Sequence, residues 1–99
     1  MYTEGVLDGL LGFDWDVHNV GHIALRGVHP SEVEQTVAHR HVIVPAVRQG
    51  EKRWKLFGRT SAGRYLVVVL TIRKRRCRPV TSYPMNIAER KRYGAQIDD

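Results

Sequence analysis

The segment GRTSAGRYLVVVLTIRKRRCRPVTSYPMNIAERKRY, residues 58–93, carries the strongest structural signals in this 99-residue chain. Within it, residues 65–72 are apolar at nearly every position, which is typical of a strand buried on both faces of a sheet. The sequence Ser-Ala-Gly at 61–63 predicts a turn before this strand, and the basic run at 73–76 predicts a hairpin connection after it. We therefore expect residues 65–72 to form the central strand of an antiparallel sheet.

Further strands are predicted on both sides of this central strand. Residues 41–47 contain a proline and are expected at a sheet edge. Residues 51–59 alternate between apolar and basic side chains, as a strand with one buried face does. Residues 78–83 predict a fourth strand. Asn86 is suited to cap a last helix, which we expect to run from residue 87 to about residue 93.

Two helices are predicted before the strands. Asp16 can cap a helix over residues 17–26, because its carboxylate can accept unpaired backbone N–H groups, and Gly27 ends that helix. The apolar side chains that share one face of it are Val20, Ile23 and Ala24. A second helix is predicted from Pro30 to about residue 39, because proline favours the first helical position.

The order of these elements predicts an α+β fold, with two N-terminal helices packed on a four-stranded antiparallel sheet and a short C-terminal helix. The length suits a single domain over residues 1–99, with an N-terminal appendage at 1–12, a core at 13–93 and a short tail at 94–99. With both N-terminal helices on one face, the other face of the sheet is expected to be exposed. That face carries Arg53, Lys55 and Arg59.

The charge of the chain is unevenly distributed. Residues 1–39 contain one basic and six acidic side chains, a net of −5, whereas residues 40–93 contain fifteen basic and two acidic ones, a net of +13. Twelve of the sixteen basic residues are arginines, whose planar guanidinium fits phosphate in a bidentate way. We therefore expect the partner to be the backbone of RNA or DNA, with an acidic protein as the second interpretation.

Other classes of protein are disfavoured. The apolar run at 65–70 is too short to span a bilayer, so no membrane role is expected. The first residues, MYTEGVLDGLLGFDWD, lack the basic start of a secretion signal, and a cytoplasmic location is expected. Cys77 is the single cysteine, so neither an internal disulfide nor a cysteine metal site is expected, and we interpret it as a filler of the core.

Four segments carry a family resemblance. They are Phe13-Asp14-Trp15-Asp16 with Asn19 and His22, GVHPSEVE at 27–34, GRT and GRYLVVV at 58–60 and 63–69, and RPVTS at 78–82 with Glu89, Arg90 and Tyr93. Together they resemble the BrnT toxins, a branch of the RelE-like fold in bacterial type II toxin–antitoxin pairs. Two positions depart from the family pattern: Arg26 stands where histidine is frequent, and Pro79 where a β-branched residue is expected.

The resemblance implies a single RelE-like domain that acts as an endoribonuclease, cleaves mRNA and inhibits translation. We expect this activity to be independent of metal ions and other cofactors. The resemblance also implies neutralisation by a cognate antitoxin, which we expect to be of the ribbon-helix-helix type, with operator DNA contacted only through the antitoxin. The alternative is a noncatalytic RNA- or protein-binding module of the same fold, either an inactive relic or a regulator.

Ribonuclease chemistry needs a 2′-OH aligned in line with the scissile phosphate, and fixed cations that meet the charge growing on its oxygens. The candidate catalytic residues are Arg59, Arg64, Arg78, Lys55 and His22. The arginines and Lys55 lie on neighbouring predicted strands and supply charge, because guanidinium does not deprotonate. His22 is the candidate general base, since imidazole exchanges a proton near neutral pH; its alternative role is packing beside the sheet.

Further contacts to RNA are expected from Arg53, Arg73, Arg76, Arg90 and Tyr93. Tyr93 could stack on a base, or alternatively attach its helix to the sheet. For the charged residues as a group, the alternative is that they only solvate an exposed sheet face. His18 and His22 have the spacing of a shared metal site, but only His29 is available as a third ligand, so no metal is expected.

Overall fold

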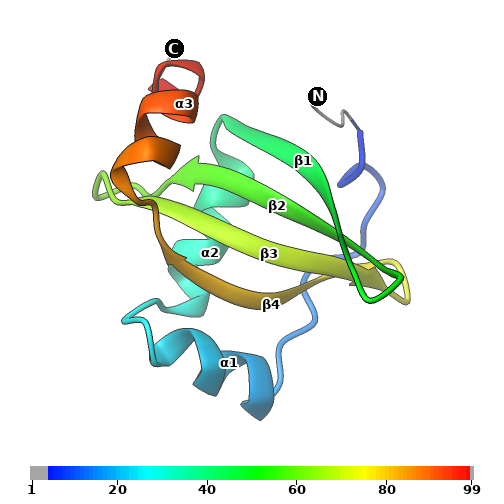
Figure 1. Ribbon diagram of the computed structural model, residues 1–99. Coiled ribbons are helices and arrows are strands. Elements are labelled where there is room, and N and C mark those ends of the chain that lie inside the picture. The colour runs from blue at the N-terminus through cyan, green and yellow to red at the C-terminus, as the bar shows by residue number, and fades with distance from the viewer. Residues whose placement is uncertain (1–4, 99) are drawn as a thin grey trace.

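A four-stranded antiparallel sheet with its strands in sequence order forms the centre of the fold (Figure 1). The computed structural model describes residues 5–98. The strands are β1 (His41–Arg48), β2 (Glu51–Arg59), β3 (Tyr65–Arg73) and β4 (Arg76–Pro84). β3 pairs with β2 on one side and β4 on the other, which confirms the prediction that the apolar run forms a central strand. The predicted α+β fold is confirmed.

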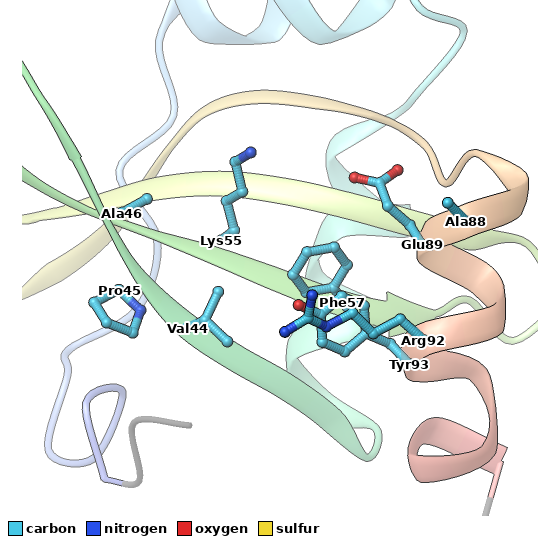
Figure 2. Close-up of a pocket in the computed structure, with 9 residues that line it drawn as sticks. All are labelled: Val44, Pro45, Ala46, Lys55, Phe57, Ala88, Glu89, Arg92 and Tyr93. Carbon is cyan, nitrogen blue, oxygen red and sulfur yellow. The ribbon is translucent and has the colours of Figure 1, made fainter. Parts of the chain in front are cut away.

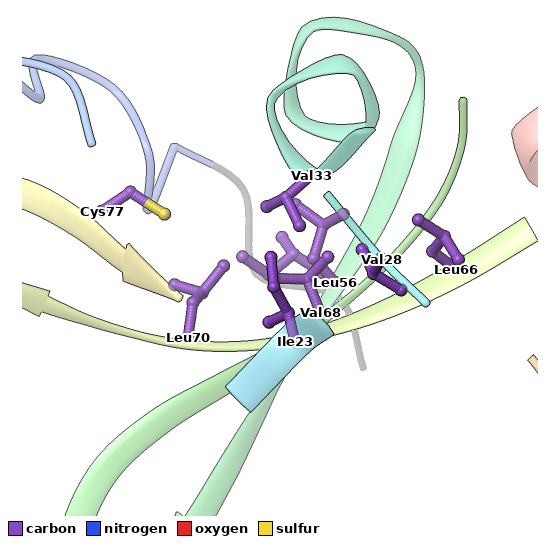
Figure 3. Close-up of a cluster of buried hydrophobic side chains, with 9 residues drawn as sticks. Ile23, Val28, Val33, Leu56, Leu66, Val68, Leu70 and Cys77 are labelled. Atoms are coloured by element: carbon purple, nitrogen blue, oxygen red, sulfur yellow. The ribbon is translucent and has the colours of Figure 1, made fainter. Parts of the chain in front are cut away.

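One face of the sheet is covered by α1 (Val17–Ala24) and α2 (Pro30–Ala38). Between these helices and the sheet lies the larger hydrophobic core, part of which Figure 3 shows. Its fully buried members include Ile23, Val33, Leu56, Leu66, Val68 and Leu70. Because α2 lies close to β2, Gly58 has no room for a side chain: a Cβ there would lie 2.8 Å from the Cβ of Thr36.

α1 begins as predicted and ends at Ala24, two residues before its predicted end. The Asp16 carboxylate accepts the backbone N–H groups of His18 and Asn19, at 2.9 and 3.1 Å. Of the three apolar side chains predicted to share one face of α1, Ile23 is buried, whereas Val20 is 36% exposed and Ala24 is exposed.

The buried position of α1 that the apolar pattern overlooked is Asn19, which is 4% exposed. Its Nδ2 donates to the carbonyl oxygens of Asp14 (2.9 Å) and Pro79 (3.0 Å). Pro79 lies next to an irregularity of the β3–β4 ladder, and β4 is the edge strand of the sheet. The buried carbonyl of Pro79 therefore needs a partner outside the ladder. Asn19 supplies this partner and attaches α1 to β4.

The opposite face of the sheet is partly covered by α3 (Ile87–Asp98), which contacts β1 and β2. The prediction that this helix ends near residue 93 is therefore wrong, and the prediction that this face is exposed holds only for the part that α3 leaves uncovered. Tyr93 stacks on Phe57 with ring centroids 3.9 Å apart, and Ile97 lies one turn later in the same small core. The helix extends past Tyr93 because Ile97 is buried only if that further turn forms.

The N-terminal segment runs beside the start of β4. Phe13 forms a parallel bridge with Cys77. The N–H of Cys77 donates to the carbonyl of Gly12 and the N–H of Asp14 donates to the carbonyl of Cys77, each at 2.9 Å. Val6, Leu7 and Leu10 pack against the larger core. No helix within residues 5–98 is long and apolar enough to cross a membrane.

Candidate nucleic-acid interface

The strand register arranges the face under α3 into rows that run across the sheet. α3 covers the row that contains Phe57 and Val67. The next two rows lie beyond the helix, and we call them the open half-face. They comprise Val44, Lys55, Val69 and Thr81, followed by Ala46, Arg53, Thr71 and Arg78. The open half-face therefore brings three cations from β2 and β4 together over a floor of small apolar and hydroxyl side chains.

Arg78 is held firmly at the edge of the open half-face. Its Nη2 lies 2.9 Å from Asp16 Oδ2, its Nη1 lies 3.5 Å from Asp14 Oδ1, and its side chain is only 16% exposed. Arg73 approaches the same Asp14 carboxylate with Nε at 3.5 Å. The pKa of Asp16 is lowered, first by the N–H of Asn19 and then by Arg78, which outweigh its desolvation. Acidic residues of the N-terminal half thus neutralise part of the basic half from within the chain.

Lys55 is the cation of the open half-face that has no carboxylate partner within residues 5–98. The neighbouring Arg53 pairs with Glu51 through Nη2, at 3.2 Å. The Nε of Arg53 is buried and has no hydrogen-bond partner within residues 5–98. Lys55 sits centrally, between Val44 of β1 and Val69 of β3. An anion on this face therefore meets an uncompensated charge at Lys55.

Arg59 lies on the same face as Lys55 but beyond the row that α3 covers. Four residues of a strand span about 13 Å, and the buried Phe57 lies between the two side chains. Arg59 Nη1 is 3.0 Å from Asp98 Oδ1, and the hydroxyl of Tyr65 donates to the same carboxylate at 2.7 Å. The C-terminal turn of α3 thus places a carboxylate where Arg59 and Tyr65 could bind another anion.

Arg64 and His22 are not brought to the open half-face. Arg64 Nη1 bonds to both oxygens of Glu32 in α2, at 2.9 and 2.8 Å, and to the carbonyl of Gly27 at 3.0 Å. Burial acts to raise the pKa of Glu32, but the N–H of His29 and the guanidinium of Arg64 outweigh it and lower that pKa. His22 is exposed on α1, which covers the opposite face.

The residues predicted to contact RNA also lie in different parts of the structure. Arg53 lies within the open half-face and Arg73 at its end, and Arg76 is exposed at the start of β4. Arg90 lies over the ring of Tyr65, with Cζ 4.1 Å from the ring centroid. Tyr93 is 8% exposed and stacked on Phe57, an arrangement that attaches α3 to the sheet.

A cavity of about 430 Å³ adjoins the open half-face, between β1, β2 and α3 (Figure 2). Its polar lining residues are Lys55, Glu89 and Arg92, and its apolar ones include Val44, Ala46, Phe57 and Ala88. Reasoning from the sequence missed Val44, Ala46 and Arg92 as site residues. Val44 and Ala46 of β1 meet Arg92 only because α3 is long enough to reach this strand and is packed against it.

Two other kinds of chemistry find little support. Cys77 is buried, and burial raises the pKa of its thiol to about 12, so it stays protonated and acts as a core residue as predicted. Within residues 5–98, no group of three or more side chains is arranged to hold a metal ion.

Tyr83 is a further group whose pKa is shifted. Desolvation, and then the charge of Glu89, raise the pKa of Tyr83 despite the nearby Arg26.

Fold and site together define a small α+β protein with a cation-lined half of one sheet face. Residues 15–89 match the family described as the ribonuclease toxin, BrnT, of type II toxin–antitoxin systems. This match covers most of the chain, which therefore belongs to the BrnT family, and the predicted resemblance is confirmed. Membership of a type II toxin–antitoxin family implies an antitoxin partner. Comparison with curated proteins finds no match.

Proposed function

We propose that this chain is a RelE-like endoribonuclease of the bacterial cytoplasm that cleaves mRNA, inhibits translation and is neutralised by a cognate antitoxin. The observation that carries this proposal is the open half-face, where Lys55 has no carboxylate partner within residues 5–98 and lies in the row next to the one that holds Arg53 and the edge residue Arg78. Because cations stabilise the charge that develops on a phosphoryl group only if they are already in position, this grouping suits RNA cleavage.

The three cations have different tasks in this proposal. Lys55 supplies the uncompensated charge that meets the scissile phosphate. Arg78, oriented by Asp14 and Asp16, holds the adjoining backbone through a guanidinium that loses little freedom on binding. Arg53 lies beside Lys55 on β2 and contacts the next phosphate. Holding the RNA strand across β2 and β4 aligns the 2′-OH with the phosphate that it attacks. The new O2′–P bond displaces the 5′-oxygen, while solvent water takes the proton of the 2′-OH and protonates the leaving oxygen.

The other predicted catalytic residues receive different roles. Arg64, the residue before β3, is a structural residue that joins the start of this strand to α2 through Glu32. Arg59 contacts phosphate only when Asp98 gives way. His22, exposed on the helix-covered side of the sheet, does not reach an RNA bound on the open half-face.

The antitoxin, in this proposal, is a ribbon-helix-helix protein that lays an acidic segment over the open half-face and excludes RNA from it. Contact with operator DNA is made by the antitoxin alone. Complementary charge speeds such an encounter and makes its rate sensitive to salt. Pull-down from the native host followed by mass spectrometry should recover a small DNA-binding protein. RNA affinity of the free toxin should also fall steeply with salt, because bound phosphates release counterions.

The central test is induced expression with growth and RNA integrity followed together. Wild-type protein should arrest growth while mRNA is degraded, and Arg78→Ala should relieve the arrest in a protein that keeps its circular dichroism spectrum. Lys52→Ala is the matched control, because this exposed lysine is adjacent to Arg53 but has its side chain on the other face of β2. The control should remain toxic.

A noncatalytic binding module is the second candidate. It is favoured by the carboxylate partners of Arg53, Arg59, Arg64 and Arg78, which leave less free charge than the sequence suggests. Wild-type protein that binds RNA but causes neither growth arrest nor RNA cleavage at high expression would establish this function instead.

A further inference from the structure

We propose that the cavity between β1, β2 and α3 is a nucleobase pocket that selects guanine in single-stranded RNA. This inference rests on the proposed function and gives it a substrate preference. The cavity, of about 430 Å³, is large enough for one base and lies at the edge of the open half-face. Lys55 belongs to both, so a base in the pocket keeps its own phosphate close to the proposed site of cleavage.

The walls of the pocket suit the flat, apolar faces of a base. Val44 of β1 and Ala88 of α3 line it together with Phe57, whose ring is fixed by stacking on Tyr93. Sequence-specific recognition of RNA places unstacked bases against such surfaces and reads their edges by hydrogen bonds. Phe57 is only 3% exposed, so most of the apolar surface that a base would meet comes from the other apolar lining residues, among them Val44 and Ala88.

The polar groups of the pocket are one carboxylate and two cations. Figure 2 shows the side chains of Lys55 and Glu89 extending from the strand and the helix on the same side of the pocket, with Arg92 on the next turn of α3. None of these three side chains forms an ion pair within residues 5–98, so their charges remain available to a ligand.

Guanine is the base that matches this set. Its Watson–Crick edge places two donors, N1–H and the 2-amino group, side by side, and a carboxylate can accept both. Its O6 and N7 accept from cations, as they do from arginine and lysine in nucleic-acid recognition. Adenine, cytosine and uracil each place an acceptor beside their donor, so a carboxylate opposite that edge is repelled.

Glu89 keeps acceptor sites for this contact on both oxygens, because each carboxylate oxygen can accept two hydrogen bonds and its own backbone cap uses one of them. Its Oε1 accepts the N–H of Asn86 at 2.9 Å, while the Asn86 side chain accepts the N–H of Glu89 at 2.8 Å, which completes a capping box at the start of α3. A glutamine performs this capping role equally well, so the cap does not require the negative charge. Glu89 and Glu51 are the two acidic residues in the +13 segment, and a negative charge beside bound phosphates weakens backbone binding. Selection of a base gives that charge a use.

The test is binding of the four nucleoside 3′-monophosphates to the full chain, measured by isothermal titration calorimetry. Wild-type protein should bind the guanosine nucleotide about tenfold more tightly than the other three, the discrimination typical of one bidentate pair. Inosine 3′-monophosphate, which lacks the 2-amino group, should bind with intermediate affinity. Glu89→Gln should reduce the preference to about twofold with an unchanged circular dichroism spectrum. Glu51→Gln, which removes the same charge outside the pocket, should keep the preference.

The outcomes separate this pocket from the proposed function. Equal affinity for all four nucleotides overturns the pocket, even if the protein cleaves RNA. Preferential binding of the guanosine nucleotide without RNA cleavage supports the pocket and overturns the proposed function. If Glu89→Gln slows cleavage of all RNAs equally and leaves guanosine binding unchanged, Glu89 acts in proton transfer and base selection by this residue is wrong.

Discussion

The two faces of the sheet are built from the same strands but are covered to different extents. α1 and α2 cover one face, whereas α3 covers only one end of the other (Figure 1). On the first face Leu56 and Val68 are completely buried, and on the second the rows of Lys55 and Arg53 stay open. Leu56 and Lys55 are neighbours in the chain, yet one belongs to the core and the other to the candidate site. A shift of one residue along β2 should therefore separate stability from function.

The largest expected effect comes from the covered face. Leu56→Ala should lower the free energy of unfolding by about 3 kcal/mol, because it removes a fully buried side chain from a core that cannot easily collapse around the gap. Urea denaturation followed by circular dichroism measures this change. A loss below about 1 kcal/mol would show that the covered face is loosely packed and would weaken the contrast between the two faces.

The neighbouring substitution on the open half-face should have the opposite profile. Lys55→Ala should slow RNA cleavage about a hundredfold, because it removes a charge placed at the phosphate, and should change the free energy of unfolding by less than about 0.5 kcal/mol. Single-turnover cleavage of a short RNA provides the rate, and Lys52→Ala provides the control. An unchanged rate for Lys55→Ala would remove this residue from the catalytic machinery.

On the covered side, the Arg64–Glu32 pair should make stability depend on pH. The pKa of Glu32 in the folded protein is lowered from its ordinary value of 4.5. The stability that ionised Glu32 contributes is therefore fully present above pH 4.5 and is lost as the pH falls through the lowered pKa. The midpoint of thermal unfolding of the wild type should therefore fall below about pH 4.5. Glu32→Gln should lower the free energy of unfolding by about 1 kcal/mol at pH 7 and make the midpoint less dependent on pH. Equal pH profiles for the two proteins would contradict this role.

The smallest expected effect concerns the end of the sheet that α3 covers. Asp98→Asn should release Arg59 and Tyr65 from a carboxylate and raise the affinity for RNA about threefold at low salt. The Arg59–Asp98 pair is largely exposed, so the free energy of unfolding should fall by less than about 1 kcal/mol. Fluorescence anisotropy with a labelled single-stranded RNA measures the change, and a weaker affinity would show that Asp98 supports the binding surface.

Local patterns were sufficient for most of the fold. The alternation over residues 51–59 assigned Leu56 and Lys55 to opposite faces, and the structure confirms both assignments. Local patterns failed where a polar residue is buried for a tertiary reason. Asn19 faces the sheet because the carbonyl of Pro79, sixty residues away in the chain, needs a donor, and no periodicity of α1 contains that information.

The candidate site was less predictable, because it depends on which charges meet. The excess of arginine and its position on neighbouring strands could be read directly, and so could the family resemblance. Which of those arginines are paired with carboxylates could not be read from the sequence. Arg64 pairs with Glu32, 32 positions away in the chain, and Arg59 pairs with Asp98, 39 positions away. Ion pairs of this kind depend on how separate elements pack, so net charge along the chain overstated the free charge on the surface.

By itself, then, the sequence determined the strand order, the central position of residues 65–72, the basic character of one sheet face and membership of a toxin family. These properties follow from hydrophobic period, turn residues and composition, which act over a few neighbouring positions. Only the tertiary structure decided that α3 closes one end of the basic face, that Lys55 alone among its cations lacks a carboxylate partner within residues 5–98, and that Glu89 and Arg92 meet Lys55 around a cavity. The physical reason is that burial and pairing of charge depend on contacts between elements far apart in the chain.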